Sequence, residues 1–372
     1  MKVLVNAGPW LTVPPPGYGG IENVVATLVP ALRERGVSVV LVSVASSSLE
    51  VDELISVYDE GQFTELQKPY NQVMGIAHAH QARVVAELRA RDDIDLVHDH
   101  LEVVGPAVLS ALGGPPVLHT LHWDLRKHPA FYGAFPSSIA VNGVSESQLA
   151  RAPDALRAAS LGSIHLATPL ADRDVRVSRG EHLVVMGRIC QLKGQHVAAR
   201  LCQKLGLPLV LAGPVSGRNT PAELDVVAQN PYHPLYGHPD VRYHLDQVSR
   251  YLDGELVRWV GAVGGQARDH LYASARAALF PIQWDEPGGT AVVEALALGV
   301  PPVGLRRGCL PEIIDHGRTG FLADREEELA EWVLRVDEID PEECRREARR
   351  RFSPSVMADR YLELYEKVTH RH

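Results

Sequence analysis

The sequence lacks long apolar runs and closely spaced cysteines. No segment of the 372 residues approaches the apolar length that crosses a bilayer, and the run from Met1 to Asn6 is too short for the core of a signal peptide. The cysteines are far apart and form no C-x-x-C pair, which favours a reducing compartment; they are Cys190, Cys202, Cys309 and Cys344. These absences predict a cytoplasmic protein without a membrane span.

A concentrated basic patch is also missing. Lys and Arg total 37 against 46 Asp and Glu, for a formal net charge of -9. The run from Arg345 to Arg351 is rich in arginine but contains Glu347 and reads as a helix, a pattern typical of a solvated helix face. We therefore do not expect nucleic acid as a partner.

Zinc-site spacings are absent as well, although histidines cluster in His98-Asp99-His100 and in His119 to His122. Residues two apart on a strand share a face, so His98 and His100 could both contact one ion. The competing expectation places both clusters at the carboxyl ends of strands, where open α/β sheets bind ligands. His100 is then structural or lines an acceptor-binding surface, and no metal is expected.

Apolar runs and amphipathic stretches alternate in two similar patterns. Residues 2–5 read as a buried strand, followed by a Pro/Gly loop at 14–20, a helix with one apolar face from Ile21 to Leu32 and a buried strand at 37–44. The pattern restarts with a strand at 182–186, a helix at 196–205 and a strand at 209–212. Strand-helix-strand units imply parallel sheets with helices on both faces.

The length of the chain is typical of two domains. The segment from Ile164 to Gly180 has no clear period and predicts an interdomain linker. We place the domains at 1–170 and 171–353. The tail, 354–372, carries apolar residues at helical spacing and predicts a final helix.

Two carboxylates lie eight positions apart in the segment W-D-E-P-G-G-T-A-V-V-E, which runs from Trp284 to Glu294. An apolar, helix-forming run follows its glycines, so Gly288, Gly289 and Thr290 are expected at a helix start, where unpaired backbone N–H groups bind anions. Glu286 and Glu294 would then flank a site for a sugar nucleotide. One acid takes sugar hydroxyls, the other takes ribose hydroxyls, and the amides take the diphosphate.

The alternative for this segment is a helix cap. If Thr290 were the N-cap, the acid of a capping box would stand at position 293, which is Val293, and Glu294 falls one residue too late. The spacing therefore favours a ligand-binding function over a cap.

The Trp284 to Glu294 segment resembles the E-x7-E signature of family 4 of the retaining glycosyltransferases, a GT-B group that takes sugars from nucleotide donors. Further motifs resemble that family in the same order along the chain. They are the loop Gly17-Tyr18-Gly19-Gly20-Ile21-Glu22, Thr120-Leu121-His122, Gly187-Arg188 through Lys193-Gly194, Gly299 to Val303, and Pro311 to Leu322.

The resemblance implies an α/β GT-B fold, with two doubly wound, Rossmann-like parallel-sheet domains facing a central cleft. It implies an acceptor-side domain over 1–170, a nucleotide-sugar-binding domain over 171–353 and a helix over 354–372 that crosses back to the first domain. Many relatives have Phe-Gly-Leu where this chain has Gly288-Gly289-Thr290. This difference predicts a more permissive sugar pocket with an added hydroxyl.

The glycine loop has a rival interpretation as a dinucleotide-binding fingerprint. Its spacing is G-x-G-G without the third glycine, and the second strand ends in Ala45-Ser46-Ser47-Ser48 without an acid for a ribose. Contact of Gly19 and Gly20 with the donor is the preferred interpretation, since glycine lets a backbone approach a ligand closely. A plain tight turn is the alternative.

The resemblance also assigns roles to three polar residues. His122 would hydrogen-bond the donor sugar, the alternative being a core histidine satisfied by backbone. Arg188 and Lys193 would stabilise the charge that grows on the departing nucleoside diphosphate, without a metal ion or other cofactor. Their alternatives are an interdomain ion pair for Arg188 and a solvated turn for Lys193.

The segment from Pro214 to Arg258 is longer than the usual connection in the family at this place and is rich in aromatic residues and histidine. It predicts a surface that contacts either the acceptor or another copy in a homo-oligomer. The residues concerned are Tyr232, His233, Pro234, Tyr236, His238, Tyr243 and His244.

The resemblance thus implies a metal-independent retaining glycosyltransferase with Glu286, His122, Arg188 and Lys193 as catalytic residues. The donor is a nucleotide diphosphate sugar. The acceptor is expected to be a soluble small molecule, because no basic amphipathic helix for a lipid surface is evident. Two alternatives stay open, a sugar-nucleotide epimerase of the same fold and a non-catalytic sugar-nucleotide sensor.

Overall fold

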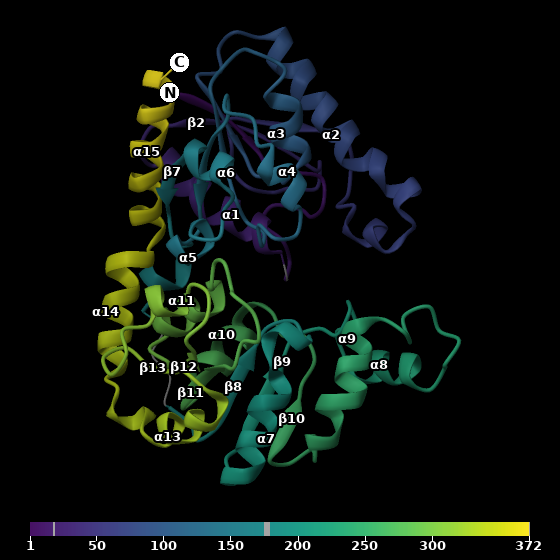
Figure 1. Ribbon diagram of the computed structural model, residues 1–372, viewed down its shortest axis with the longest axis vertical. Coiled ribbons are helices and arrows are strands. Elements are labelled where there is room, and N and C mark those ends of the chain that lie inside the picture. Colours follow the sequence, from purple (N-terminus) through teal and green to yellow (C-terminus); the bar gives the residue numbers. More distant parts are fainter. Residues whose placement is uncertain (18, 175–178, 372) are drawn as a thin grey trace. The chain divides into compact units, whose positions relative to one another are not determined.

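The computed structural model describes residues 1–17, 19–174 and 179–371. The chain divides into two compact units. Met1–Ala167 and the helix that begins at Pro354 form the first unit, and Thr168–Ser353 forms the second. Each unit is built around one parallel β-sheet (Figure 1).

The sheet of the first unit has seven parallel strands within the described residues, in the order β3-β2-β1-β4-β5-β6-β7. The strands are β1 (Lys2–Asn6), β2 (Ser38–Ser43), β3 (Glu53–Ser56), β4 (Leu96–Asp99), β5 (Val117–Thr120), β6 (Ala140–Gly143) and β7 (Ser160–Ser163). The helices are α1 (Gly20–Arg33), α2 (Tyr70–Ala90), α3 (Val104–Leu109), α4 (Pro129–Gly133), α5 (Glu146–Leu149), α6 (Asp154–Ala159) and α15 (Pro354–Arg371), with a short 3-10 helix η1 (Phe63–Gln67).

Both faces of this sheet are buried, so its central strand reads as a continuous apolar run. Val3 and Val5 point to the face covered by α1 and α15, whereas Leu4 points to the core on the opposite face. Figure 1 shows α15, in yellow, alongside this unit. The hydroxyls of its Tyr361 and Tyr365 reach polar side chains at the ends of the central strands.

The sheet of the second unit has six parallel strands within the described residues, in the order β10-β9-β8-β11-β12-β13. The strands are β8 (Leu183–Met186), β9 (Leu209–Ala212), β10 (Val257–Trp259), β11 (Ala277–Phe280), β12 (Pro302–Leu305) and β13 (Phe321–Ala323). The helices are α7 (Gln195–Leu205), α8 (Pro221–Ala228), α9 (Pro239–Tyr243), α10 (Gly265–Ala273), α11 (Thr290–Ala297), α12 (Leu310–Ile313), α13 (Leu329–Leu334) and α14 (Pro341–Phe352).

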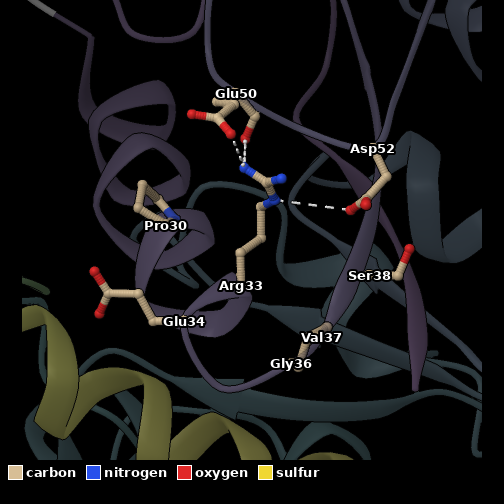
Figure 2. A pocket seen from close by; sticks show the side chains of 8 residues that line it. All are labelled: Pro30, Arg33, Glu34, Gly36, Val37, Ser38, Glu50 and Asp52. Carbon is tan, nitrogen blue, oxygen red and sulfur yellow. Dashed lines mark hydrogen bonds and ion pairs between the residues drawn. The ribbon is translucent and has the colours of Figure 1, made fainter.

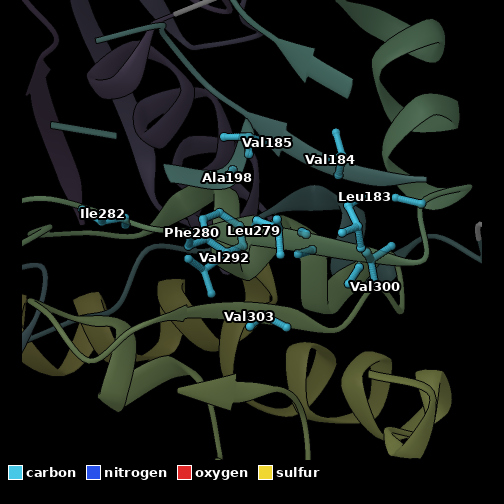
Figure 3. Close-up of a cluster of buried hydrophobic side chains, with 14 of the residues drawn as sticks. Leu183, Val184, Val185, Ala198, Leu279, Phe280, Ile282, Val292, Val300 and Val303 are labelled. Atoms are coloured by element: carbon cyan, nitrogen blue, oxygen red, sulfur yellow. The ribbon is translucent and has the colours of Figure 1, made fainter. Parts of the chain in front are cut away.

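Short turns complete the second unit. They are the 3-10 helices η2 (Pro169–Asp172), η3 (Gln191–Lys193), η5 (Ser249–Tyr251), η6 (Glu326–Glu328) and η7 (Val336–Glu338), and the π-helical turn η4 (His244–Val248). The core holds Leu183 and Val185 of β8, Leu279 of β11 and Val292 of α11, which Figure 3 shows together. The start of α11 is therefore anchored to the sheet by its own apolar face.

Strand order reverses between β1 and β4 in the first sheet and between β8 and β11 in the second. The crevice outside the carboxyl ends of strands at such a point is where open α/β sheets bind ligands. The glycine loop follows β1, and the segments that hold Arg188 and Glu286 follow β8 and β11. The glycine loop of the first unit and the two segments of the second unit therefore start from the switch points, whereas His122 follows β5, the neighbour of β4.

The predicted linker at 164–180 is packed along much of its described length. Ile164 and Ala167 lie in the core of the first unit, and Leu170 and Ala171 lie in the core of the second. Residues 175–178 lie outside the described residues. No helix within the described ranges has the length and apolar character needed to cross a membrane.

Candidate functional site

Lys193 and Glu286 meet at the switch point of the second sheet. Nζ of Lys193 donates to Oε2 of Glu286 over 2.6 Å, and Nε1 of Trp284 donates to the same oxygen over 3.0 Å. The Glu286 side chain is 13% exposed and that of Lys193 30%. Both side chains keep some exposure, so a ligand can reach them. Lys193 forms a specific ion pair, unlike the solvated turn residue that was the alternative.

A glycine turn brings Lys193 to this position. Gly194, directly after η3, has φ +71°, and a Cβ there would lie 2.0 Å from the carbonyl oxygen of Pro281 at the end of β11. Only glycine allows the two loops to approach so closely. The loop that follows β8 is thus packed against the residue that follows β11.

Helix α11 starts at Thr290 and has Gly289 as its N-cap, with φ +63° and no side-chain cap. The cap alternative for Thr290 is therefore wrong, since Thr290 is already the first helical residue. In the described residues, the backbone N–H groups of Thr290 and Ala291 have no acceptor, as expected at a helix start. A Cβ on Gly289 would lie 2.7 Å from both Cys309 Sγ and Ile313 Cδ1.

Glu294 lies one turn into α11 and pairs with a residue that no sequence motif singled out. Nη1 of Arg268, on α10, donates to Oε1 of Glu294 over 3.2 Å, and Nη2 of Arg268 reaches Asp269 over 2.9 Å. Burial raises the pKa of Glu294 above its ordinary value, against the lowering effect of Arg268. The carboxyl group retains some exposure, 15% of its side chain.

Arg188 pairs with Asp240, its Nη1 lying 3.2 Å from Oδ2. Asp240 lies in the first turn of α9 and belongs to the same unit. This contact is therefore not the interdomain ion pair that was weighed as the alternative for Arg188. The guanidinium is 44% exposed, so an anion can reach it.

The segment at 214–258 is only partly the surface that its composition predicts. Tyr243 and His244 are buried, and the hydroxyl of Tyr243 accepts a hydrogen bond from the backbone N–H of His196 over 3.0 Å. These two residues belong to the core, because large aromatic groups also fill space between helices and a sheet. Tyr232, in contrast, is 95% exposed.

The glycine loop of the first unit ends at the start of α1. Gly19 is the N-cap, and a Cβ there would lie 2.7 Å from Cγ of Pro15. Gly20 is the first helical residue, and a Cβ there would have no other atom within 4 Å. Tyr18 lies outside the described residues. Glu22 is buried in the first turn, and burial raises its pKa.

His122 lies just beyond β5 in contact with His100 and Glu102. Its Nε2 is 2.9 Å from Nδ1 of His100, and its backbone N–H donates to Oε1 of Glu102 over 2.5 Å. Burial lowers the pKa of His122 to about 4. His122 is partly exposed and its ring bonds a side chain, unlike the core histidine satisfied by backbone that was the alternative, whereas His100 is completely buried.

A buried charged cluster supports this loop. Nδ1 of His119 lies 2.6 Å from Oδ2 of Asp99, and its Nε2 lies 3.5 Å from Glu102. Burial alone lowers the pKa of His119, but the hydrogen bond to Asp99 and the charge of Glu102 outweigh it and raise the pKa to about 9. His119 is therefore an imidazolium that compensates the two buried acids.

His98 and His100 do not converge on one ion. The nitrogens of His98 are engaged by the hydroxyls of Tyr365 at 2.7 Å and Thr120 at 2.8 Å. His100 is bonded to His122 instead. Among the described residues, no group of three or more potential ligands is arranged around a metal position.

A shallow hollow of about 590 Å³ lies at the opposite, amino-terminal edge of the first sheet (Figure 2). Arg33 lies in it, 3.1 Å from Glu50 and 3.7 Å from Asp52. The acids neutralise the cation, and none of the predicted site residues is there. We assign no ligand to this hollow.

Sequence reasoning missed Glu102, Asp240 and Arg268. Glu102 follows His98-Asp99-His100 directly after β4, so its place at a strand end was a usable signal. Asp240 and Arg268 had no such signal. They meet Arg188 and Glu294 from 52 and 26 residues away in sequence.

Comparison with known proteins identifies the family. Residues 18–157 match Glycosyltransferase Family 4, and residues 173–353 match Glycosyl transferases group 1. The chain is 28% identical over 364 residues to a D-inositol 3-phosphate glycosyltransferase of Pseudarthrobacter chlorophenolicus, covering 85% of this chain and 80% of that protein.

Solved structures agree on the fold. The structure of AviGT4, a glycosyltransferase involved in avilamycin A biosynthesis, is 26% identical, with a TM-score of 0.64 over 100% of this chain and 98% of that one. Sucrose-phosphate synthase from Thermosynechococcus elongatus is 18% identical, with a TM-score of 0.70 and complete coverage of both chains. The chain therefore belongs to family 4 of the glycosyltransferases and has the GT-B fold.

Proposed function

We propose that this glycosyltransferase is retaining and metal-independent, and that it passes a sugar from a nucleotide diphosphate sugar to a soluble small-molecule acceptor. One observation carries the proposal. Lys193, Glu286 and the uncapped start of α11 converge at the switch point of the second sheet.

The diphosphate is assigned to the amides of Thr290 and Ala291 together with Lys193 and Arg188. A helix start and fixed cations favour an anion without any rearrangement of the backbone. Each cation is held by an acid of the same unit, Lys193 by Glu286 and Arg188 by Asp240. A bound diphosphate would compete with these acids for the cations, and the cations would then stabilise the charge of the leaving group without a metal ion.

Glu286 and Glu294 are assigned to hydroxyl groups on the two sides of the diphosphate. Glu286 would accept hydrogen bonds from the transferred sugar, and Glu294 from the ribose. Arg268 holds Glu294 in place at 3.2 Å, so this carboxyl group is oriented before a ligand binds.

In the first unit, Gly19 and Gly20 are proposed to contact the donor, and His122 to hydrogen-bond the sugar. The precedent of the family that the sequence resembles favours front-face transfer, in which the acceptor attacks on the side from which the leaving group departs and the anomeric configuration is retained.

A soluble acceptor is supported by a relative. The D-inositol 3-phosphate glycosyltransferase, at 28% identity, is named for a small phosphorylated polyol. Tyr232 and its neighbours in the 214–258 segment stay the predicted surface for an acceptor or for a second copy of the chain.

Incubation of the protein with a panel of UDP-, GDP-, ADP- and dTDP-sugars tests the proposal, with and without polyol and sugar acceptors. A transferase releases nucleoside diphosphate, and the release accelerates with the right acceptor. Interconversion of the donor sugar without release would identify an epimerase. A thermal shift without either reaction would identify a sensor.

A further inference from the structure

The ring of His122 is held by a second histidine. Nδ1 of His100 and Nε2 of His122 are 2.9 Å apart. Two neutral imidazoles can make this hydrogen bond only if one nitrogen carries the proton and the other accepts it. The direction of the bond therefore sets the tautomer of both rings.

The surroundings of His100 select one direction. His100 is completely buried, and its Nε2 has no partner in the described part of the chain. If Nδ1 of His100 were the acceptor, its Nε2 would carry a buried N–H without an acceptor, which is rare in folded proteins. If Nδ1 is the donor, Nε2 is only an unused acceptor.

The same direction leaves His122 with its proton on Nδ1. This atom has no assigned partner within the described residues, and it is not among their buried, unpartnered nitrogens. It is therefore accessible on the partly exposed His122 ring. Protonation of the pair is opposed by burial and by the neighbouring His119 imidazolium.

Glu102 fixes the backbone from the other side. Its Oε1 accepts from the N–H groups of His122 and Trp123, at 2.5 and 2.8 Å, and its Oε2 accepts from the hydroxyl of Tyr132 at 2.7 Å. Backbone and ring of His122 are thus held independently, and only the ring contact controls the tautomer.

We propose that His100 is a positioning residue that holds His122 as the neutral Nδ1–H tautomer, so that His122 donates a hydrogen bond to an oxygen of the bound ligand and does not act as a base. The assignment of that oxygen to the donor sugar rests on the proposed function. The assignment of the tautomer rests only on the hydrogen bond between the two rings and on the burial of His100.

The test uses the full chain with ¹⁵N-labelled histidine and no ligand, at pH 7.5. Long-range ¹H–¹⁵N correlation distinguishes protonated from unprotonated ring nitrogens. The chain has 17 histidines, so the His122 signals are identified as those missing in His122→Gln. The variants are His100→Phe, which removes the donor, and His100→Asn, whose amide N–H takes the place of Nδ1–H. His98→Gln, in β4 two residues before His100, is the matched control.

We expect protonated Nδ1 and unprotonated Nε2 for His122 in the wild type, in His100→Asn and in His98→Gln, and the Nε2–H form in a folded His100→Phe. We further expect His100→Phe to lower donor turnover about tenfold or more, with recovery in His100→Asn. A wild-type Nε2–H tautomer would overturn the proposal, as would wild-type turnover in His100→Phe. If the tautomer is as expected but no sugar nucleotide is turned over, the proposed function fails and the tautomer assignment stands.

Discussion

Lys193 and Glu286 contact each other directly, with 2.6 Å between Nζ and Oε2. Their sequence motifs assign one to the leaving diphosphate and the other to the sugar, without predicting that they touch. Because the two groups form an ion pair in the free protein, donor binding as we propose it would redistribute the hydrogen bonds of both. Substitutions here therefore separate binding from turnover.

Glu286→Gln and Glu294→Gln should affect the nucleotide differently. Glu294 is assigned to the ribose, so its substitution should weaken the binding of a nucleoside diphosphate about tenfold, the loss of one good hydrogen bond. Glu286→Gln should leave that affinity nearly unchanged or improve it, because Lys193 loses its competing acid. Calorimetric titration with the nucleoside diphosphate alone decides, and equal losses in both variants would reject this division of roles.

Arg188→Ala and Lys193→Ala should each slow turnover by about 10²- to 10³-fold, with a smaller change in donor affinity, since both act on one developing charge. The double variant should be less impaired than the product of the two single effects, because groups that act as a unit are not additive. Single-turnover rates at saturating donor measure this. An unchanged rate in either single variant would show that the residue has only a structural function, Arg188 in its ion pair with Asp240 or Lys193 in its ion pair with Glu286.

Activity should survive excess EDTA. We propose that Arg188, Lys193 and the start of α11 stabilise the charge of the leaving diphosphate, as a divalent ion does in other transferases. The measurement compares initial rates before and after chelation. Loss of activity that manganese or magnesium restores would contradict the assignment of these groups.

Gly289→Ala should destabilise the second unit by on the order of 2 kcal/mol or more, because φ of +63° and contacts of 2.7 Å leave no room for a Cβ. Gly75→Ala is the control, since no atom lies within 4 Å of its Cβ position and the site is inside α2. It should be neutral or slightly stabilising. Urea unfolding provides both values, and equal effects would argue against a required glycine at the start of α11.

His119→Gln should reveal the buried charge cluster through pH. Because the folded pKa of His119 is raised to about 9, its contribution to stability is full below the unfolded value of about 6.5 and is lost as pH rises through about 9. The stability difference between wild type and variant, about 3–5 kcal/mol for a broken buried pair, should therefore be largest near pH 6 and shrink toward pH 9. A constant difference over this range would show that His119 is neutral in the fold.

The parts of the fold that could be predicted are those with a local signal. β9 occupies Leu209–Ala212 as predicted, and α7 begins one residue before the predicted helix, because an apolar run buried on both faces and a glycine at each helix end mark these elements. The start of α11 was predicted for the same reason. Local patterns also suggested which loops carry the site, since they follow buried strands.

The remaining features depend on tertiary contacts. Arg268 reaches Glu294 from another helix, and no residue spacing in either helix predicts this pair. Tyr243 was misassigned to a surface because an aromatic side chain carries no sign of whether it faces solvent or core. The His100–His122 bond joins two strand ends 22 residues apart. Predicting this bond would have required knowledge of the strand order in the sheet.

The most direct test of the donor-site assignment is the release of nucleoside diphosphate from a saturating sugar nucleotide by the wild type and by Glu286→Gln. The account predicts that the wild type releases it and that Glu286→Gln, while still binding the nucleoside diphosphate, releases it at least about 10²-fold more slowly. Equal release rates for the two proteins would contradict it.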